Sequence, residues 1–281
     1  MDNENKILIR QCMFDSEDEW NQYISLQNEV YKDRHKTFRK DSFIHYFLNN
    51  PSGKVISFGV FVNDTMVANY SCIPKKMLID GRVVNGLLSM ATVTHPDYRG
   101  RGLFKTLAKM TYDKAKEDDY EFVIGVANAN SFHGFMKYFP FKFVDRLEVK
   151  VGYGSNIRRK EGVIFSGYYD NEIMKWRASW RSFYRTNHSC VEGEHGKFVR
   201  THMGSFEKEA LSHLSLPKSK CSLLPKLYVG IGAKTKGMFF NVPKFIKRSP
   251  FNLIFMDLTN GSLPKVTKEN IQFQLWDFDV A

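Results

Sequence analysis

The sequence lacks any hydrophobic run long enough to cross a membrane. Its longest apolar runs, residues 122–127 and 253–256, are far shorter than the roughly 20 residues that a transmembrane helix needs. The opening residues MDNENKILIR also lack the apolar core of a signal peptide. We therefore expect a cytoplasmic protein that has no membrane partner.

Cysteine is scarce, and no cysteine pair has the spacing of a metal site. The four cysteines are widely separated, and none stands near a histidine at a metal-ligand spacing: Cys12, Cys72, Cys190 and Cys221. This pattern is typical of reduced thiols in a reducing compartment. We expect no metal in this protein.

Acidic residues are too few to balance the basic ones, so the formal net charge is +11. Such a charge favours anionic partners, which include nucleic acid and phosphorylated small molecules. The basic residues occur in small scattered groups, and no signature of a nucleic-acid-binding module accompanies them. We therefore expect a phosphorylated small-molecule partner and no nucleic acid.

The first half of the chain has the pattern of strands interrupted by helices, and no internal repeat is evident. Turn residues at Asn63-Asp64 and Asp80-Gly81 predict two hairpins. We predict strands at 7–10, 55–62, 66–73, 76–79, 83 onward, 87–94, 122–127 and 141–151, and helices at 15–30, 40–48, 103–116 and 131–139. This order predicts an α+β fold, in which helices pack on a mixed sheet.

The second half is also predicted to be α+β. Residues 152–160 are polar, basic and glycine-containing, which predicts a linker between two domains, 1–151 and 152–281. Beyond the linker we predict a helix at 172–184 and strands at 197–203, 227–231, 251–258 and 271–278. Alternation in the last strand predicts two faces, with Ile271, Phe273 and Leu275 on one and Gln272, Gln274 and Trp276 on the other.

The segment Thr92 to Phe104, TVTHPDYRGRGLF, has the features of a phosphate-binding loop. A strand ends, a proline-containing turn follows, and Gly100 and Gly102 precede a helix that begins near Leu103. Glycine lets a phosphate approach the backbone, and the amides of a helix N-terminus attract an anion. Arg99 and Arg101 add positive charge, so the segment predicts a pyrophosphate site.

Two other glycine-loop motifs do not fit this segment. A Walker loop requires GxxxxGK followed by Ser or Thr, which the sequence lacks. A dinucleotide fingerprint requires GxGxxG after the first strand of a βαβ unit, but Gly100-Arg101-Gly102 continues to Lys105 and follows predicted hairpins. Nucleoside-triphosphate and dinucleotide binding are therefore not predicted.

The segment resembles the acyl-CoA-binding motif of the GNAT superfamily of N-acetyltransferases. That motif has a strand, His-Pro, an aromatic residue and Arg-x-x-Gly-x-Gly or Ala, followed by a helix; Arg99 and Gly102 fit it, and Phe104 stands where Gly or Ala is usual. The resemblance implies a GNAT-like mixed, mostly antiparallel sheet in 1–151, with acyl-CoA between splayed strands 87–94 and 122–127. The implied cofactor-binding residues are Thr92, Val93, Thr94, Arg99, Gly100, Arg101, Gly102, Leu103, Phe104, Asn128, Asn130 and Ser131.

The end of the chain, residues 276–280, resembles a longer, two-part branch of the superfamily. In that branch a smaller, degenerate GNAT-like second domain helps to form the acceptor pocket, and the acceptor is an amino sugar on a nucleotide diphosphate. The resemblance implies an acyl-CoA-dependent N-acyltransferase. Because an anionic acceptor suits basic and aromatic side chains, we expect Arg177, Trp180 and Arg181 near it. Homodimers are common in the superfamily. An aminoglycoside, a polyamine, a protein or peptide amine, or an acyl-CoA-binding module without turnover remain alternatives.

The two catalytic side chains that the family commonly has are absent from this sequence. Met136 stands where the family usually has a proton-donating Tyr, and residues 87–93 contain no carboxylate. Three candidates for proton transfer remain: His133, which lies one turn before Met136; Tyr138, two positions beyond it; and His95, in the turn before the loop. A mechanism without a protein base, in which proximity supplies much of the rate, also remains open.

Overall fold

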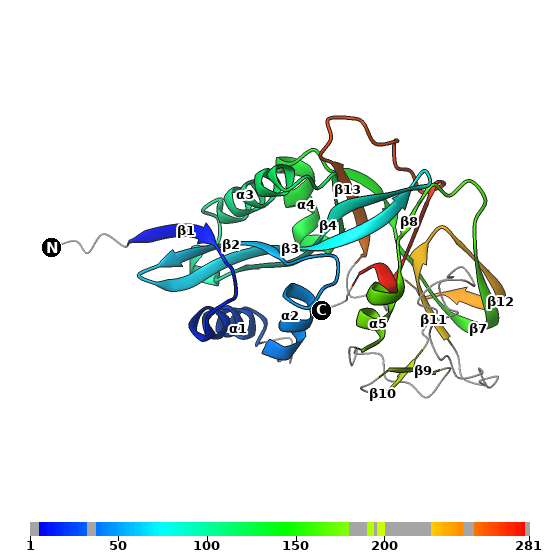
Figure 1. Ribbon diagram of the computed structural model, residues 1–281, viewed down its shortest axis with the longest axis horizontal. Helices are drawn as coiled ribbons and strands as arrows, with labels where there is room; N and C mark the ends of the chain where they lie inside the picture. Colours follow the sequence, from blue (N-terminus) through cyan, green and yellow to red (C-terminus); the bar gives the residue numbers. More distant parts are fainter. Residues whose placement is uncertain are drawn as a thin grey trace. The chain divides into compact units, whose positions relative to one another are not determined.

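A computed structural model describes residues 6–32, 38–179, 190–193, 196–199, 226–243 and 250–278 (Figure 1). The chain forms two compact units, one of Met1–Lys75 with Asn85–Val123 and one of Lys76–Val84 with Ile124–Ala281. Strands β3, β4 and β5 each contribute residues to both units. The division into domains 1–151 and 152–281 stays a prediction.

The first unit has strands β1 to β5 with three helices on their two faces. Helices α1 and α2 cover one face of β2 to β4, and α3 covers the other (Figure 1). The elements are β1 (Ile7–Gln11), α1 (Glu17–Tyr31), α2 (Lys40–Phe47), β2 (Ile56–Val62), β3 (Thr65–Ile79), β4 (Arg82–Thr94), the 3-10 helix η2 (Pro96–Tyr98), α3 (Leu103–Glu117) and β5 (Phe122–Ala127). Among the strands that the structure describes, β1 pairs only with β2, and the order continues through β3 and β4 to β5. The three predicted helices of this unit are confirmed.

Both predicted hairpin turns are confirmed by their backbone angles. Asn63 and Asp64 have φ of 46° and 62°, and Asp80 and Gly81 have 48° and 77°. Left-handed residues at both central positions give the two-residue turn whose twist matches the strands. The predicted break between 66–73 and 76–79 is wrong, because β3 is continuous through Pro74.

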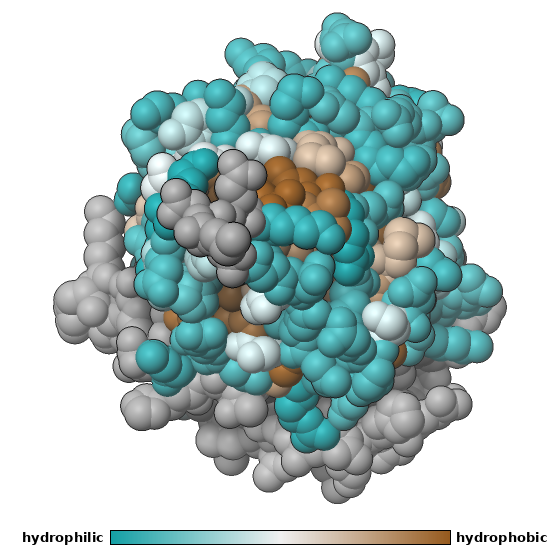
Figure 2. Space-filling model, turned by 90° about the vertical axis from the view of Figure 1, so that its left-hand side faces the viewer, coloured by the Kyte–Doolittle hydropathy of each residue, from teal (hydrophilic) through white to brown (hydrophobic). Residues whose placement is uncertain are grey.

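An aromatic core lies between α1, α2 and the sheet. Phe14, Trp20, Tyr23 and Phe47 are buried, and their ring centroids lie 4.6 to 6.4 Å apart. Trp20, Tyr23 and Leu26 of α1 point into this core, as the spacing of its apolar residues predicts. Figure 2 shows one face of the molecule, which is mainly hydrophilic and has several separate hydrophobic patches.

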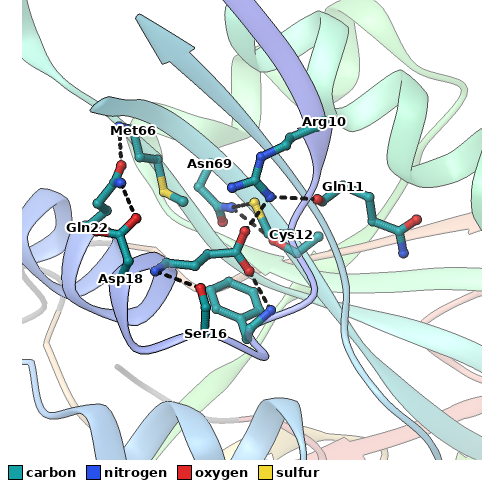
Figure 3. A network of polar contacts seen from close by, with 11 residues as sticks. Arg10, Gln11, Cys12, Ser16, Asp18, Gln22, Met66 and Asn69 are labelled. Atoms are coloured by element: carbon teal, nitrogen blue, oxygen red, sulfur yellow. Dashed lines mark hydrogen bonds and ion pairs between the residues drawn. The ribbon is translucent and has the colours of Figure 1, made fainter. Parts of the chain in front are cut away.

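The first turn of α1 is fixed by a buried carboxylate. Glu19 is 3% exposed, and its two oxygens accept from the guanidinium of Arg10 in β1 and the backbone amide of Phe14. Ser16 caps the helix, because its hydroxyl accepts from the amide of Glu19 at 3.2 Å. Figure 3 shows how this network joins the strand to the helix. Glu17, in the same turn, is exposed and pairs with Lys40.

We expect Glu19→Ala to lower the free energy of unfolding by about 2 kcal/mol, since the buried Phe14 amide loses its acceptor. The matched change Glu17→Ala breaks an ion pair of a 72% exposed carboxylate. It should cost less than about 1 kcal/mol. Urea denaturation of both variants tests this, and equal losses would contradict a special role of Glu19.

The second unit contains the remaining elements. These are α4 (Ala129–Tyr138), β6 (Lys142–Arg146), β7 (Glu148–Arg159), β8 (Phe165–Gly167), α5 (Asn171–Ser179), β9 (Cys190–Gly193), β10 (Gly196–Val199), β11 (Lys226–Ile231), β12 (Ala233–Asn241), β13 (Asn252–Asp257), β14 (Ile271–Gln274) and the 3-10 helix η3 (Leu275–Asp277). Strands run in the order β12-β7-β11-β14-β8 to the end of β3, and β13 lies between β5 and β6. β14 and β8 pair in parallel, whereas other neighbouring strands, such as β7 and β12, pair antiparallel. The predicted mixed, mostly antiparallel sheet flanked by helices is confirmed.

Two sequence predictions in this unit are wrong. The strand predicted at 141–151 is divided into β6 and β7 at Leu147, whose amide donates to the carbonyl of Phe251. The linker predicted at 152–160 is strand, because β7 pairs with β12 along its length. A Cβ on Gly152 would lie 1.9 Å from the carbonyl oxygen of Met238, so this glycine serves close strand contact rather than chain flexibility.

The strand predicted at 271–278 is shorter in the structure. All four residues of β14 are buried, including Gln272 and Gln274, and the strand ends at η3. β14 pairs with β11 along one edge and with β8 along the other, and the burial of all its alternating residues shows that both of its faces are covered as well. The side chain of Trp276 lies outside the described residues. No helix in the part of the chain that is described is long and apolar enough to span a bilayer.

Candidate functional site

The loop between β4 and α3 has the backbone that its glycines predict. Gly100 and Gly102 have φ of 77° and 76°, in the left-handed region that residues with a side chain rarely adopt. A Cβ placed on either glycine would meet no atom within 4 Å. The glycines are therefore required by the backbone turn, and the space in front of them is open to a ligand.

The N-terminus of α3 is suited to bind an anion. Gly102 is its N-cap and provides no side-chain hydrogen bond, and the first turn contains no acidic residue. The amide of Thr106 makes the first helical bond, to the carbonyl of Gly102 at 3.1 Å. The partial positive charge of this helix end is not offset by a carboxylate of its own turn.

The two loop arginines lie folded back on the loop. Arg99 Nε donates to the carbonyl of Thr94 at 3.2 Å, and Arg101 Nη2 donates to the carbonyl of Asp97 at 3.0 Å. The guanidinium carbon of Arg101 lies 4.9 Å from the centre of the Tyr98 ring. A guanidinium has five N–H donors. Each arginine uses one of them in the bond given above, so its other N–H groups can donate to a phosphate.

His95 joins the loop to α1. The amide of Asp97 donates to Nδ1 at 3.3 Å, and Nε2 lies 2.9 Å from Glu29 Oε1. Because an amide can only donate, Nδ1 must accept, which leaves the ring proton on Nε2 for Glu29. Both ring nitrogens are thus used in positioning the turn, and neither points to an open position as a base.

A second contact from α1 reaches the end of β4. The hydroxyl of Tyr31 donates to the carbonyl of Thr92 at 3.3 Å. Glu29 and Tyr31 were not predicted as site residues. No motif marks them, because their contacts join positions more than 60 residues apart in the chain.

Phe104 packs under the helix, at the position where the family usually has Gly or Ala. Its ring lies edge-on to Tyr70 of β3, with centroids 5.8 Å apart. The Tyr70 hydroxyl donates to Ser89 Oγ at 2.8 Å and lies 2.7 Å from the Tyr112 hydroxyl. Phe104 thus covers a buried polar cluster. In β4, Val93 is buried, whereas Thr92 and Thr94 are partly exposed.

The buried thiols and phenols of the first unit are poor proton acceptors. Burial raises the pKa of Cys72 to about 12, and burial together with the nearby Glu19 carboxylate raises the pKa of Cys12 to about 12. Burial also raises the pKa of Tyr70 and Tyr112 well above the usual range for tyrosine. At neutral pH these groups stay protonated, so none of the four provides a base or a thiolate nucleophile.

Helix α4 of the second unit carries the other predicted residues. Asn128 is its N-cap, and its Oδ1 accepts from the amides of Asn130 and Ser131 at 2.9 and 3.0 Å. His133 is exposed, and Tyr138 is 44% exposed with Lys137 Nζ 5.4 Å from its ring centre. His133 and Tyr138 are therefore accessible to solvent.

The predicted acceptor residues are only partly described. Arg177 lies in α5, with its guanidinium carbon 5.5 Å from the ring centre of its neighbour Trp176. Trp180 and Arg181 lie outside the described residues. Their assignment to the acceptor site stays a prediction.

We expect Asn128→Ala to lower the free energy of unfolding by about 1 kcal/mol, because α4 loses its side-chain cap. Asn130→Ala is the matched control, since Asn130 contributes its backbone amide to this cap. It should leave stability nearly unchanged. Chemical denaturation of both variants measures the difference, and an unchanged Asn128→Ala would exclude the capping role.

Comparison with known proteins agrees with this geometry. Residues 15–139 match the family model described as an acetyltransferase (GNAT) domain. This match confirms the GNAT fold predicted from the loop and supports the expectation of an acyl-CoA-dependent N-acyltransferase. The match covers the loop, α3, β5 and α4. No curated protein matches the chain significantly.

Several solved structures match part of the chain. One is a probable N-acyltransferase from Enterococcus faecalis V583, with 12% identity, 55% of this chain and 39% of that chain covered, and a TM-score of 0.43. Another is Saccharomyces cerevisiae N-myristoyltransferase with bound myristoyl-CoA, with 14% identity, 60% and 49% covered, and a TM-score of 0.46. A third is the ribosomal-protein-S18-alanine N-acetyltransferase from Escherichia coli, with 13% identity, 59% and 85% covered, and a TM-score of 0.37. The matched region thus spans less than half the length of the first two proteins.

Proposed function

We propose that this protein transfers an acyl group from acyl-CoA to the amine of a nucleotide-linked amino sugar, such as a dTDP- or UDP-amino-deoxy sugar. One observation supports the acyl-CoA part of this proposal. The loop of Gly100 and Gly102 leads into the start of α3, where no side chain caps the helix and the first turn has no acidic residue. A pyrophosphate there would accept hydrogen bonds from main-chain amides and from Arg99 and Arg101. The family match over residues 15–139 supports the same half.

The proposed reaction is direct attack of the amine on the thioester. The amine nitrogen forms a bond to the acyl carbon, the C–S bond breaks, and the CoA thiolate takes up a proton as the amine loses one. The amine must be neutral when it attacks, so water or a side chain removes its proton. Because His95 is bonded through both ring nitrogens, we assign it to positioning and leave His133 and Tyr138 as the side-chain candidates.

Charge supports an anionic acceptor. The net charge of +11 suits a protein that binds two phosphorylated ligands, acyl-CoA and a nucleotide diphosphate. Polyamines and aminoglycosides are cations, and a site for them should be acidic. The acceptor half of the proposal rests on this charge and on the resemblance of the second half to the two-part branch.

The loop assignment predicts a loss of CoA affinity in the double variant Arg99→Ala with Arg101→Ala. Each charge-assisted hydrogen bond to phosphate contributes about 1.5 to 3 kcal/mol, so we expect a loss of at least about tenfold. Lys109→Ala with Lys116→Ala removes the same charge from α3 beyond its first turn, and it should bind CoA as the wild type does. Calorimetry at one salt concentration compares them. Unchanged affinity of the arginine variant would overturn the loop assignment.

The acceptor is identified by thiol release. The protein would be incubated with acetyl-CoA or longer acyl-CoAs and a panel of amino-sugar nucleotides, aminoglycosides, polyamines and peptides. We expect release of CoA thiol with an amino-sugar nucleotide, and a much smaller signal when the same sugar lacks its nucleotide diphosphate. Release with a cationic acceptor alone would overturn the amino-sugar assignment. Binding of acyl-CoA without release for any acceptor would favour a module without turnover, which Met136 at the usual Tyr position makes a specific alternative.

A further inference from the structure

We infer that an exposed apolar face of strands β7 and β12 binds the surface of an anionic lipid membrane. Four side chains form this face, which we call the β7–β12 face. They are Val151 and Tyr153 of β7 and Met238 and Phe240 of β12, with exposed fractions of 37, 48, 67 and 70%. The inference is independent of the proposed acceptor, because it concerns a surface rather than the CoA loop.

The register of the two strands makes these four side chains one contiguous patch. Tyr153 pairs with Met238, and Val151 pairs with Phe240. Residues two apart in a strand share a face, and directly opposed residues in an antiparallel pair have Cβ atoms about 5 Å apart. Figure 1 shows β7 and β12 side by side at one edge of the second unit.

Such a face is unusual on a sheet edge. β12 is the last strand in the order β12-β7-β11-β14-β8, so among the described strands only β7 pairs with it. Natural edge strands usually avoid exposed apolar side chains, because these promote association. A cluster of exposed apolar residues on a folded protein commonly marks a surface that is covered by a partner.

The charge of the surrounding sequence indicates which partner covers the face. Residues 210–256, which include β12, contain no Asp or Glu. The same stretch contains eight basic residues: Lys218, Lys220, Lys226, Lys234, Lys236, Lys244, Lys247 and Arg248. Apolar side chains within a basic stretch are the combination that binds anionic lipid headgroups, where the charges attract the surface and the apolar groups insert.

Two other partners fit this combination less well. A second copy of the chain would bring two acid-free basic stretches together, and like charges repel at an interface. Single-stranded nucleic acid would use aromatic rings for base stacking, whereas Val151 and Met238 offer aliphatic surface at half of the face. The absence of a spanning segment, which led us to expect no membrane partner, does not bear on peripheral binding.

The test is sedimentation of the full chain with vesicles. We expect binding to phosphatidylcholine vesicles that contain about 30% phosphatidylglycerol, weak binding to phosphatidylcholine alone, and a loss of binding as salt rises. Met238→Ser with Phe240→Ser should lower the partition coefficient on anionic vesicles by at least about tenfold, given the apolar surface removed. Ile7→Ser with Leu8→Ser is the matched control, because Ile7 and Leu8 are 63% and 42% exposed on β1. It should bind as the wild type does.

Several results would overturn the inference. The first is a wild-type chain that does not bind anionic vesicles at low salt, which needs no variant. The second is equal loss of binding in both double variants. The third is a wild-type dimer in light scattering that becomes monomeric only with Met238→Ser and Phe240→Ser. The fourth is binding to an oligonucleotide, but not to vesicles, that this variant abolishes. Circular dichroism and thiol release should be unchanged in the variant, since the side chains are exposed.

Discussion

The hydrogen bonds of the His95 imidazole determine the shape of the loop on which the proposed CoA site depends. Nδ1 accepts from the Asp97 amide and so fixes the turn, while Nε2 bonds Glu29 and so fixes the turn to α1. Tyr31 adds a contact from the same helix to Thr92. At the other end of α1, the Glu19 carboxylate accepts a hydrogen bond from Arg10 of β1 and so holds the first turn of the helix to that strand. The loop proposed to bind phosphate is therefore positioned by a helix that is hydrogen-bonded to strands at both of its ends.

The parts of the fold that depend on local chemistry could be predicted from the sequence. The Asn63-Asp64 and Asp80-Gly81 turns follow from which residues accept a positive φ. The loop at Gly100 and Gly102 follows from the same constraint, because its shape is set by the backbone. Helices α1 and α3 follow from the spacing of their apolar residues.

The parts that depend on distant partners could not be predicted. Gly152 suggested a flexible linker, yet it allows the backbone of β12 to approach. The polar side chains of Gln272 and Gln274 gave no indication that both faces of β14 are buried. Within the candidate site, the resemblance predicted the loop residues. It could not show that Glu29 orients His95 or that Phe104 rests on Tyr70, because such contacts leave no pattern in the sequence.

The position of β13 has a consequence for synthesis of the chain. β13 lies between β5 and β6 and pairs with β6, and the Asn252 side chain donates to the carbonyl of Ala127. On the ribosome, β5 and β6 emerge roughly 100 residues before β13, a delay of about 5 to 20 s at ordinary translation rates. During that interval both strands have an unpaired edge. A nascent chain of this protein is thus exposed to edge-to-edge aggregation and to chaperone capture until β13 has been translated.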